Sequence, residues 1–464
     1  MTEQDNAFDT MKQQLKTKEL FEQAKTYAYE YIDNLETMPV SPSPEALEGL
    51  AAFDEPLPKE PADAEEILKL LHQNGSPATV AQTGGRYFGF VNGSTVPATM
   101  ASRWLSDVWD QNCGIYVMSP VASKLEELCE RWLVSLFRLP EGTAMGLVSG
   151  SSMAAFCALC AARNELLKRQ GWDANSNGLF GAPPLRVVLG EQAHSSVFKA
   201  LSLLGLGRDR VERVPVDSQG RIIPEKLPPL DAYTLVIAQA GHVNTGAFDP
   251  LDKICAAARK AGAWVHVDGA FGLWAAASPN TYPLIKGLED ADSWSADAHK
   301  TLNAPYDCGI VLCKDRSALV CAMQAAASYI QFSEHRDGML YCTDMSRRAR
   351  SIELWATLKS LGSDGIAHLV DTLCENARYF AQCLAQNGFD ILNDVVYNQV
   401  LVQCKTPEQT TATLNNIQAG SVFWCGGATW EGKPVIRLSV CSWKTTHQDI
   451  DACVQAFTQA RDGY

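Results

Sequence analysis

The sequence predicts an α/β protein with a mostly parallel sheet, preceded by a helical segment and followed by a smaller α+β domain. From about residue 146, short apolar runs that resemble buried strands alternate with amphipathic stretches of helical spacing. Such alternation is typical of a parallel sheet covered by helices. The expected strands are Arg186–Leu189, Leu235–Ala238, Trp264–Val267 and Ile310–Cys313, with helices at Ser195–Leu204 and Leu251–Ala261 between them.

The first 40 residues predict helix, because apolar side chains recur at helical spacing from Leu15 to Tyr31. Repeated prolines between Pro39 and Pro61 argue against regular structure there. Two further helical patterns follow, at Met100–Trp109 and Val121–Phe137.

After a loop near 327–346, a long helix is expected to begin near Arg347 and to lead into the C-terminal third. That third mixes helices with expected strands at Gln399–Val402 and Val435–Val440. We therefore expect three parts: an N-terminal helical segment and linker (1–95), a large domain (96–355) and a small α+β domain (356–464).

The composition is that of an ordinary globular protein, with 464 residues of which 46% are hydrophobic and 20% charged. A formal net charge of −14 repels phosphate backbones and disfavours nucleic-acid binding. No apolar run reaches the length of a membrane span, and the first residues lack an apolar signal core. These features predict a cytoplasmic protein.

Fifteen cysteines show no paired CxxC motifs. Cys157 and Cys160 form a single CxxC in an Ala-rich helical run, without histidine or a second pair at zinc spacing. We expect these two thiols to pack in the core, and we expect no metal site.

Gly150, Ser151 and Ser152 precede that Ala-rich helix. Glycine allows close approach of a ligand, and a helix N-terminus presents free N–H groups to an anion. The segment is a candidate phosphate cradle, although a Ser-rich turn is also an ordinary helix cap.

Two further candidates follow expected strands. His194 lies in a loop after a strand, where α/β proteins place ligand sites, and its flat ring could stack on a planar cofactor. Asp268 ends the strand Trp264–Val267, where a buried carboxylate needs a cationic partner such as a pyridinium N–H. The alternatives are a surface histidine and a carboxylate that caps the next turn.

Lys300 completes the set, in Asp297-Ala298-His299-Lys300. Partial desolvation would make its amine nucleophilic, so it is a candidate for a Schiff base. Solvated loop lysines are far commoner. The four groups together are a more specific signal than any one of them, because an anion cradle, a ring, a carboxylate and a lysine occur in order along the chain, each attached to a different strand or helix end.

The combination resembles the group II pyridoxal-phosphate (PLP)-dependent amino-acid decarboxylases, through residues 194–196, 264–268, 291–294 and 299–300. The resemblance implies the aspartate-aminotransferase-type fold, a homodimer with active sites near the interface, and release of CO2 from an L-amino acid to leave an amine. Alternatives on the same scaffold are an aldehyde synthase, another lyase, an aminotransferase or a non-catalytic PLP-binding protein.

Residue by residue, the resemblance implies that Lys300 binds PLP as a Schiff base and that Asp268 pairs with the ring nitrogen. His194 would stack on one face of the ring, and Ala270 on the other. Gly150, Ser151 and Ser152 would hold the phosphate, with His299 beside Lys300. Ser119, Pro120 and Glu126 would fall in the segment that shapes the substrate pocket.

Relatives supply a proton from a tyrosine on a mobile loop, which corresponds here to 328–344. Tyr341 is our preferred donor and Tyr329 the alternative. The chain departs from the family at Met153, Val243 and Thr301, where Glu, Thr and Trp are usual. These departures leave the substrate open.

Overall fold

Seven strands form the large sheet of the computed structural model, which describes residues 3–324 and 334–463. β8 runs antiparallel to β2 and β7, and the other pairs are parallel. This confirms the prediction of a mostly parallel sheet. In spatial order the strands are β2 (Ala144–Val148), β8 (Gly309–Cys313), β7 (Ser293–Asp297), β6 (Trp264–Asp268), β5 (Thr234–Gln239), β3 (Arg186–Gly190) and β4 (Glu212–Val214).

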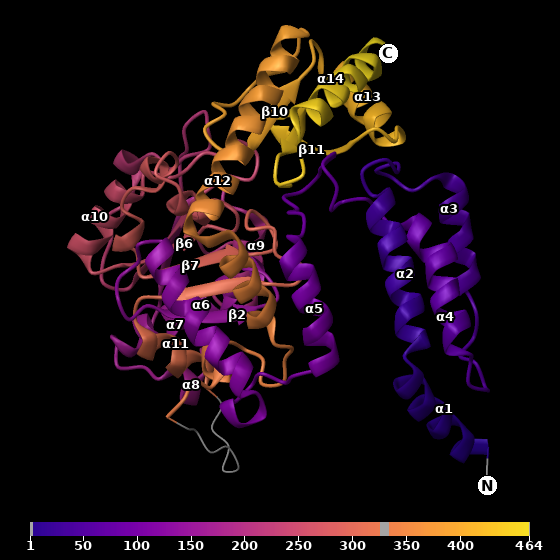
Figure 1. Ribbon diagram of the computed structural model, residues 1–464. Coiled ribbons are helices and arrows are strands. Elements are labelled where there is room, and N and C mark those ends of the chain that lie inside the picture. Colours follow the sequence, from indigo (N-terminus) through magenta and orange to yellow (C-terminus); the bar gives the residue numbers. More distant parts are fainter. Residues whose placement is uncertain (1–2, 325–333, 464) are drawn as a thin grey trace.

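Helices cover both faces of this sheet (Figure 1). One apolar core forms against α7 (Ser151–Lys168), α9 (Ser195–Leu203) and α11 (Arg316–Met323). A second core forms on the opposite face, against α6 (Pro120–Leu136) and α10 (Leu251–Ala261). Because both faces are covered, the central strands are buried along their length, which explains their continuous apolar runs. The short α8 (Ala174–Asn177) follows α7.

Cys157 and Cys160 lie in α7 with their side chains in the first of these cores. Neither forms a disulfide. Burial raises the pKa of both thiols, as expected of cysteines that serve as small apolar residues.

The carboxyl ends of the parallel strands lie in line at one edge of the sheet. In the ladder, Gln239 at the end of β5 is opposite Asp268, and Asp268 is opposite Ser295 of β7. The loops that follow β3, β5, β6 and β7 therefore meet at this edge, which faces the small domain.

The small domain contains a second sheet with helices α13 (Pro407–Ala419) and α14 (His447–Asp462) packed against it. The β1–β11 pair is parallel and the other pairs are antiparallel. Its strands, in spatial order, are β1 (Tyr87–Phe88), β11 (Trp424–Trp430), β12 (Lys433–Ser439), β10 (Gln399–Gln403) and β9 (Asp390–Ile391).

Helix α12 (Arg350–Gln386) runs from the large domain into the small one (Figure 1). It kinks at Gly362, whose φ of 64° lies in the left-handed region that favours glycine. The domain boundary expected between residues 355 and 356 falls inside α12, before this kink. Residues 87 and 88 lie in the part expected to be the N-terminal helical segment and linker (1–95), but they form β1, which pairs with β11 of the small sheet.

The N-terminal helices stand apart from the body of the protein (Figure 1). They are α1 (Glu3–Thr17), α2 (Glu19–Asn34), α3 (Pro44–Glu48) and α4 (Ala64–Leu70), and α5 (Pro97–Trp109) then leads into the large domain. Within residues 3–324 and 334–463, no helix is long and apolar enough to cross a membrane.

Candidate active site

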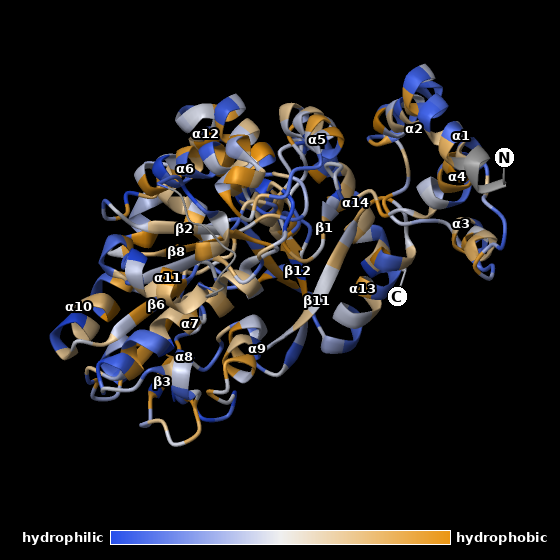
Figure 2. Cartoon of the chain, turned by 90° about the horizontal axis from the view of Figure 1, so that it is seen from below, coloured by the Kyte–Doolittle hydropathy of each residue, from blue (hydrophilic) through white to orange (hydrophobic). Residues whose placement is uncertain are grey.

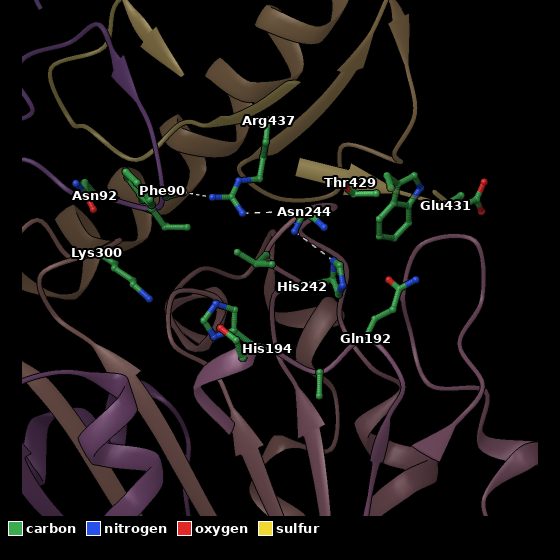
Figure 3. Close-up of a pocket in the computed structure, with 15 residues that line it drawn as sticks. Phe90, Asn92, Gln192, His194, His242, Asn244, Lys300, Thr429, Glu431 and Arg437 are labelled. Carbon is green, nitrogen blue, oxygen red and sulfur yellow. Dashed lines mark hydrogen bonds between the residues drawn. The ribbon is translucent and has the colours of Figure 1, made fainter. Parts of the chain in front are cut away.

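A cavity of about 650 Å³ lies between the carboxyl edge of the large sheet and the small domain (Figure 3). Loops from the large domain form one wall, and the hairpin of β11 and β12 forms the other. The residues that line it are Phe90, Val91, Asn92, Gln192, Ala193, His194, Ser195, His242, Val243, Asn244, Lys300, Thr429, Trp430, Glu431 and Arg437.

Lys300 reaches this cavity from the turn after β7. Its Nζ lies 3.0 Å from Oδ2 of Asp297, the last residue of β7, whose side chain is 2% exposed. The other carboxylate oxygen, Oδ1, accepts a hydrogen bond of 2.5 Å from the backbone N–H of Ser151. One buried carboxylate thus joins the lysine to the start of α7. Sequence reasoning missed Asp297, although a carboxylate that ends a strand was the signal used for Asp268.

Gly150, Ser151 and Ser152 form the N-terminus of α7, as predicted for an anion cradle. The backbone of Gly150 packs tightly on β8, since a Cβ at Gly309 would lie 2.4 Å from the Gly150 Cα. This contact fixes the start of the helix next to Asp297 and Lys300.

His194 lines the cavity and caps α9. Its Nδ1 lies 2.7 Å from the Ser196 hydroxyl and accepts the Ser196 backbone N–H at 3.3 Å. These contacts orient the ring. Burial lowers the pKa of His194, partly opposed by the negative charge of Asp268, so the imidazole is neutral at pH 7 and can cover a flat ligand.

Asp268 ends β6 and is 7% exposed. Its Oδ1 accepts the backbone N–H of Ala270 at 3.2 Å. Among the described residues it forms no ion pair. A buried carboxylate without a cation is costly, so the site calls for a ligand that brings one.

His299 lies behind Lys300 rather than in the cavity wall. Its Nδ1 accepts the Cys308 backbone N–H at 3.1 Å, and its ring stacks on Tyr306 with centroids 4.4 Å apart. Nε2 is 3.7 Å from Asp297 Oδ2. Burial lowers the pKa of His299.

Arg437 on β12 points into the cavity from the small domain (Figure 3). Its guanidinium makes two long contacts of 3.5 Å, to the Asn244 side chain and the Phe90 carbonyl. Its Nε is buried and has no hydrogen-bond partner among the described residues. Burial lowers the pKa of Arg437. Sequence reasoning missed this residue, because an arginine in an alternating strand is ordinarily exposed.

Tyr341 does not lie in this cavity. Its ring packs in the core beneath β2, and its hydroxyl accepts a hydrogen bond of 2.9 Å from Arg316 at the start of α11. α11 follows β8, which ends at Cys313 opposite Ser293, the first residue of β7. Tyr341 is therefore near the edge of the sheet opposite Lys300, and this arrangement does not support its assignment as proton donor. Tyr329 lies outside the described residues.

Ser119, Pro120 and Glu126, which were expected to shape the substrate pocket, also lie outside this cavity. Ser119 caps α6, and Glu126 is buried between Arg336 and Arg347. Neither lines the cavity. Three positions differ from the residues usual in the family. Val243 lies in the cavity wall. Thr301 is buried and its hydroxyl donates a hydrogen bond to the Phe271 carbonyl, and Met153 packs against the core around α7.

A lysine, a neutral imidazole, an unpaired buried carboxylate and a helix N-terminus thus surround one edge of the sheet. A family model described as the pyridoxal-dependent decarboxylase conserved domain matches residues 44–405. The chain belongs to the pyridoxal-dependent decarboxylase family. Its cofactor is accordingly PLP, and the donor set suits that molecule: the carboxylate for the pyridine nitrogen, the helix N-terminus for the phosphate.

Relatives of known activity and structure agree with this membership. The chain is 28% identical to the mouse acidic amino acid decarboxylase GADL1, over 79% of this chain and 68% of that protein. It is 28% identical to the phenylacetaldehyde synthase of Petunia hybrida, over 78% and 75%. The structure superposes on Oryza sativa TDC crystallised with PLP and tryptamine, with a TM-score of 0.88, 20% identity, and 96% and 98% of the two chains covered. The predicted fold, cofactor and enzyme class are confirmed.

Proposed function

We propose that this enzyme decarboxylates an L-amino acid to its amine and CO2, and that Lys300 binds PLP covalently as a Schiff base. The observation that supports this most directly is the convergence of Lys300, His194 and the unpaired Asp268 at the carboxyl edge of one sheet. When bound, PLP supplies an electron sink for the electron pair that the departing carboxylate leaves behind.

Each remaining residue has a role toward that cofactor. Asp268 would hold the proton on the pyridine nitrogen, His194 would cover one face of the ring, and Ala270 would lie against the other. The N–H groups and hydroxyls of Ser151 and Ser152 hold the phosphate, with Gly150 allowing close approach. The hairpin of β11 and β12 forms the wall of the cavity opposite the large sheet.

Arg437 is suited to bind a carboxylate of the substrate. It is a partly buried cation that shares the cavity with Lys300, and no carboxylate pairs with it among the described residues. A substrate carboxylate would form charge-assisted hydrogen bonds with the guanidinium, including the unpartnered Nε.

Arg437→Met should therefore lower kcat/KM by about 10- to 100-fold, the equivalent of about 1.5–3 kcal/mol for hydrogen bonds to a charged group. PLP binding should not change, because Arg437 is assigned to the substrate. Arg208→Met, which removes an arginine that is 71% exposed, is the control and should leave kcat/KM unchanged. An Arg437→Met enzyme with wild-type kcat/KM would remove Arg437 from substrate recognition.

One experiment identifies both the amino acid that the enzyme accepts and the product that it releases. Purified PLP-loaded enzyme is incubated with each common L-amino acid, and CO2, amine and aldehyde are measured. Amine in equal amount to CO2 supports the proposal. Aldehyde in place of amine would support the second candidate, an aldehyde synthase, which the similarity to the Petunia protein favours.

We further propose that the chain is a homodimer formed through its N-terminal helices. Both α2 and α5 carry apolar residues that are exposed in one copy, and apolar colouring marks parts of both helices in Figure 2. Contiguous exposed apolar surface is typical of protein–protein contacts. These residues are Phe21, Tyr29 and Ile32 on α2 and Trp104, Leu105, Val108 and Trp109 on α5. A second copy would bury them in a symmetric contact.

Sedimentation should give about twice the 50.6 kDa of the chain. Val108→Lys, at a position that is 77% exposed in one copy, should shift the protein toward the monomer. A wild-type monomer at micromolar concentration would contradict the dimer.

A further inference from the structure

The carboxylate of Asp297 uses the same N–H group that a phosphate at the start of α7 would use. Its Oδ1 accepts the Ser151 N–H at 2.5 Å, and its Oδ2 is 3.0 Å from Lys300 Nζ. The Asp297 side chain therefore contacts both groups that are proposed to bind PLP, which are the N-terminus of α7 and Lys300.

Among the described residues, Lys300 is the only charged basic group paired with the Asp297 carboxylate. The imidazole of His299 is 3.7 Å away, but burial lowers its pKa, so it is neutral at pH 8. The Asp297 side chain is 2% exposed, so water screens it weakly. A phosphate dianion bound at Gly150–Ser152 would lie next to this negative charge.

We propose that Asp297 sets the affinity for the cofactor by opposing its phosphate. In this role it is a positioning residue that occupies the anion cradle and holds Lys300 until PLP binds. The inference rests on the proposed phosphate and lysine positions, and it concerns a residue that neither the family match nor the sequence motifs assign.

The test compares PLP with pyridoxal, which carries the same ring and aldehyde but no phosphate. Dissociation constants of both are measured at pH 8 by quenching of tryptophan fluorescence, for apoenzyme of the wild type and of Asp297→Asn. The amide has the same shape and its oxygen can still accept the Ser151 N–H. Any effect of the variant on Lys300 acts on both ligands and cancels in the ratio of the two constants.

Asp297→Asn should bind PLP at least tenfold more tightly relative to pyridoxal than the wild type does, a difference of about 1.4 kcal/mol. Asp292→Asn is the matched control. Asp292 lies just before β7, where it accepts the Val265 N–H at 2.8 Å at the far edge of the sheet, so its replacement should leave the ratio unchanged.

An unchanged or lowered ratio in Asp297→Asn would overturn this role for Asp297. Borohydride reduction and peptide mapping of the same samples separates that failure from a failure of the proposed function. If Lys300 is labelled and the ratio is unchanged, only the role of Asp297 is wrong. If another lysine is labelled, the proposed cofactor position is wrong as well.

Discussion

Asp268→Asn is expected to retain PLP and to lose more than nine-tenths of its turnover. The wild-type carboxylate is buried at the end of β6 and has no cationic partner among the described residues, so the pyridine nitrogen can serve as that partner. A neutral amide lowers the pKa of the ring nitrogen, and the electron sink weakens. The proposed phosphate contacts at α7 and the proposed covalent bond to Lys300 do not depend on Asp268.

The measurement pairs the absorbance of bound PLP with the rate of CO2 release under saturating substrate. Full occupancy with turnover below one-tenth of wild type, a barrier higher by at least about 1.4 kcal/mol, is the expected outcome. A fully occupied variant that keeps more than one-tenth of the wild-type rate would show that Asp268 does not hold the ring proton.

Glu126→Gln is expected to destabilise the fold by about 3–5 kcal/mol, the typical cost of removing one member of a buried ion pair. Glu126 on α6 is 1% exposed and contacts Arg347 Nη2 at 2.6 Å and Arg336 Nε at 3.1 Å. Both arginine side chains are at most 6% exposed. The amide would leave two buried guanidinium groups without full compensation.

Urea unfolding measures this loss, and the next residue along α6 provides the control. Glu127 pairs with Lys124 and Arg131 on the surface, where such pairs contribute about 0–1 kcal/mol. Glu127→Gln should therefore unfold near the wild-type midpoint. Equal midpoints for the two variants would show that the buried network does not stabilise the fold.

His194 and Asp268 were proposed from the sequence because each lies at the end of a strand that an apolar run predicts. Lys300 follows β7, which was not expected as a strand, and it was proposed because it lies near strand-forming residues and beside His299. Parallel strands bring their carboxyl ends together, so residues far apart in the chain become neighbours at one edge. Local pattern and this topological rule were the basis for proposing His194, Asp268 and the start of α7 as parts of one site.

The place of Tyr341 in the fold could not be predicted, because its position in the chain does not reveal which edge of the sheet it meets. β8 runs antiparallel, so the segment after it starts at the edge opposite Lys300, and nothing in the apolar run shows that reversal. Arg437 was missed for a different reason: its role depends on the small domain packing over the cavity. Asp297 faces Lys300 across a single turn, a contact that spacing alone does not reveal.

The most direct test of the account is the identity of the lysine that binds the cofactor. Purified holoenzyme should absorb at roughly 410–430 nm, as a protonated Schiff base of PLP does. Borohydride reduction followed by peptide mapping should then find the pyridoxyl group on Lys300. A pyridoxyl group on any other lysine would contradict the assignment of the site.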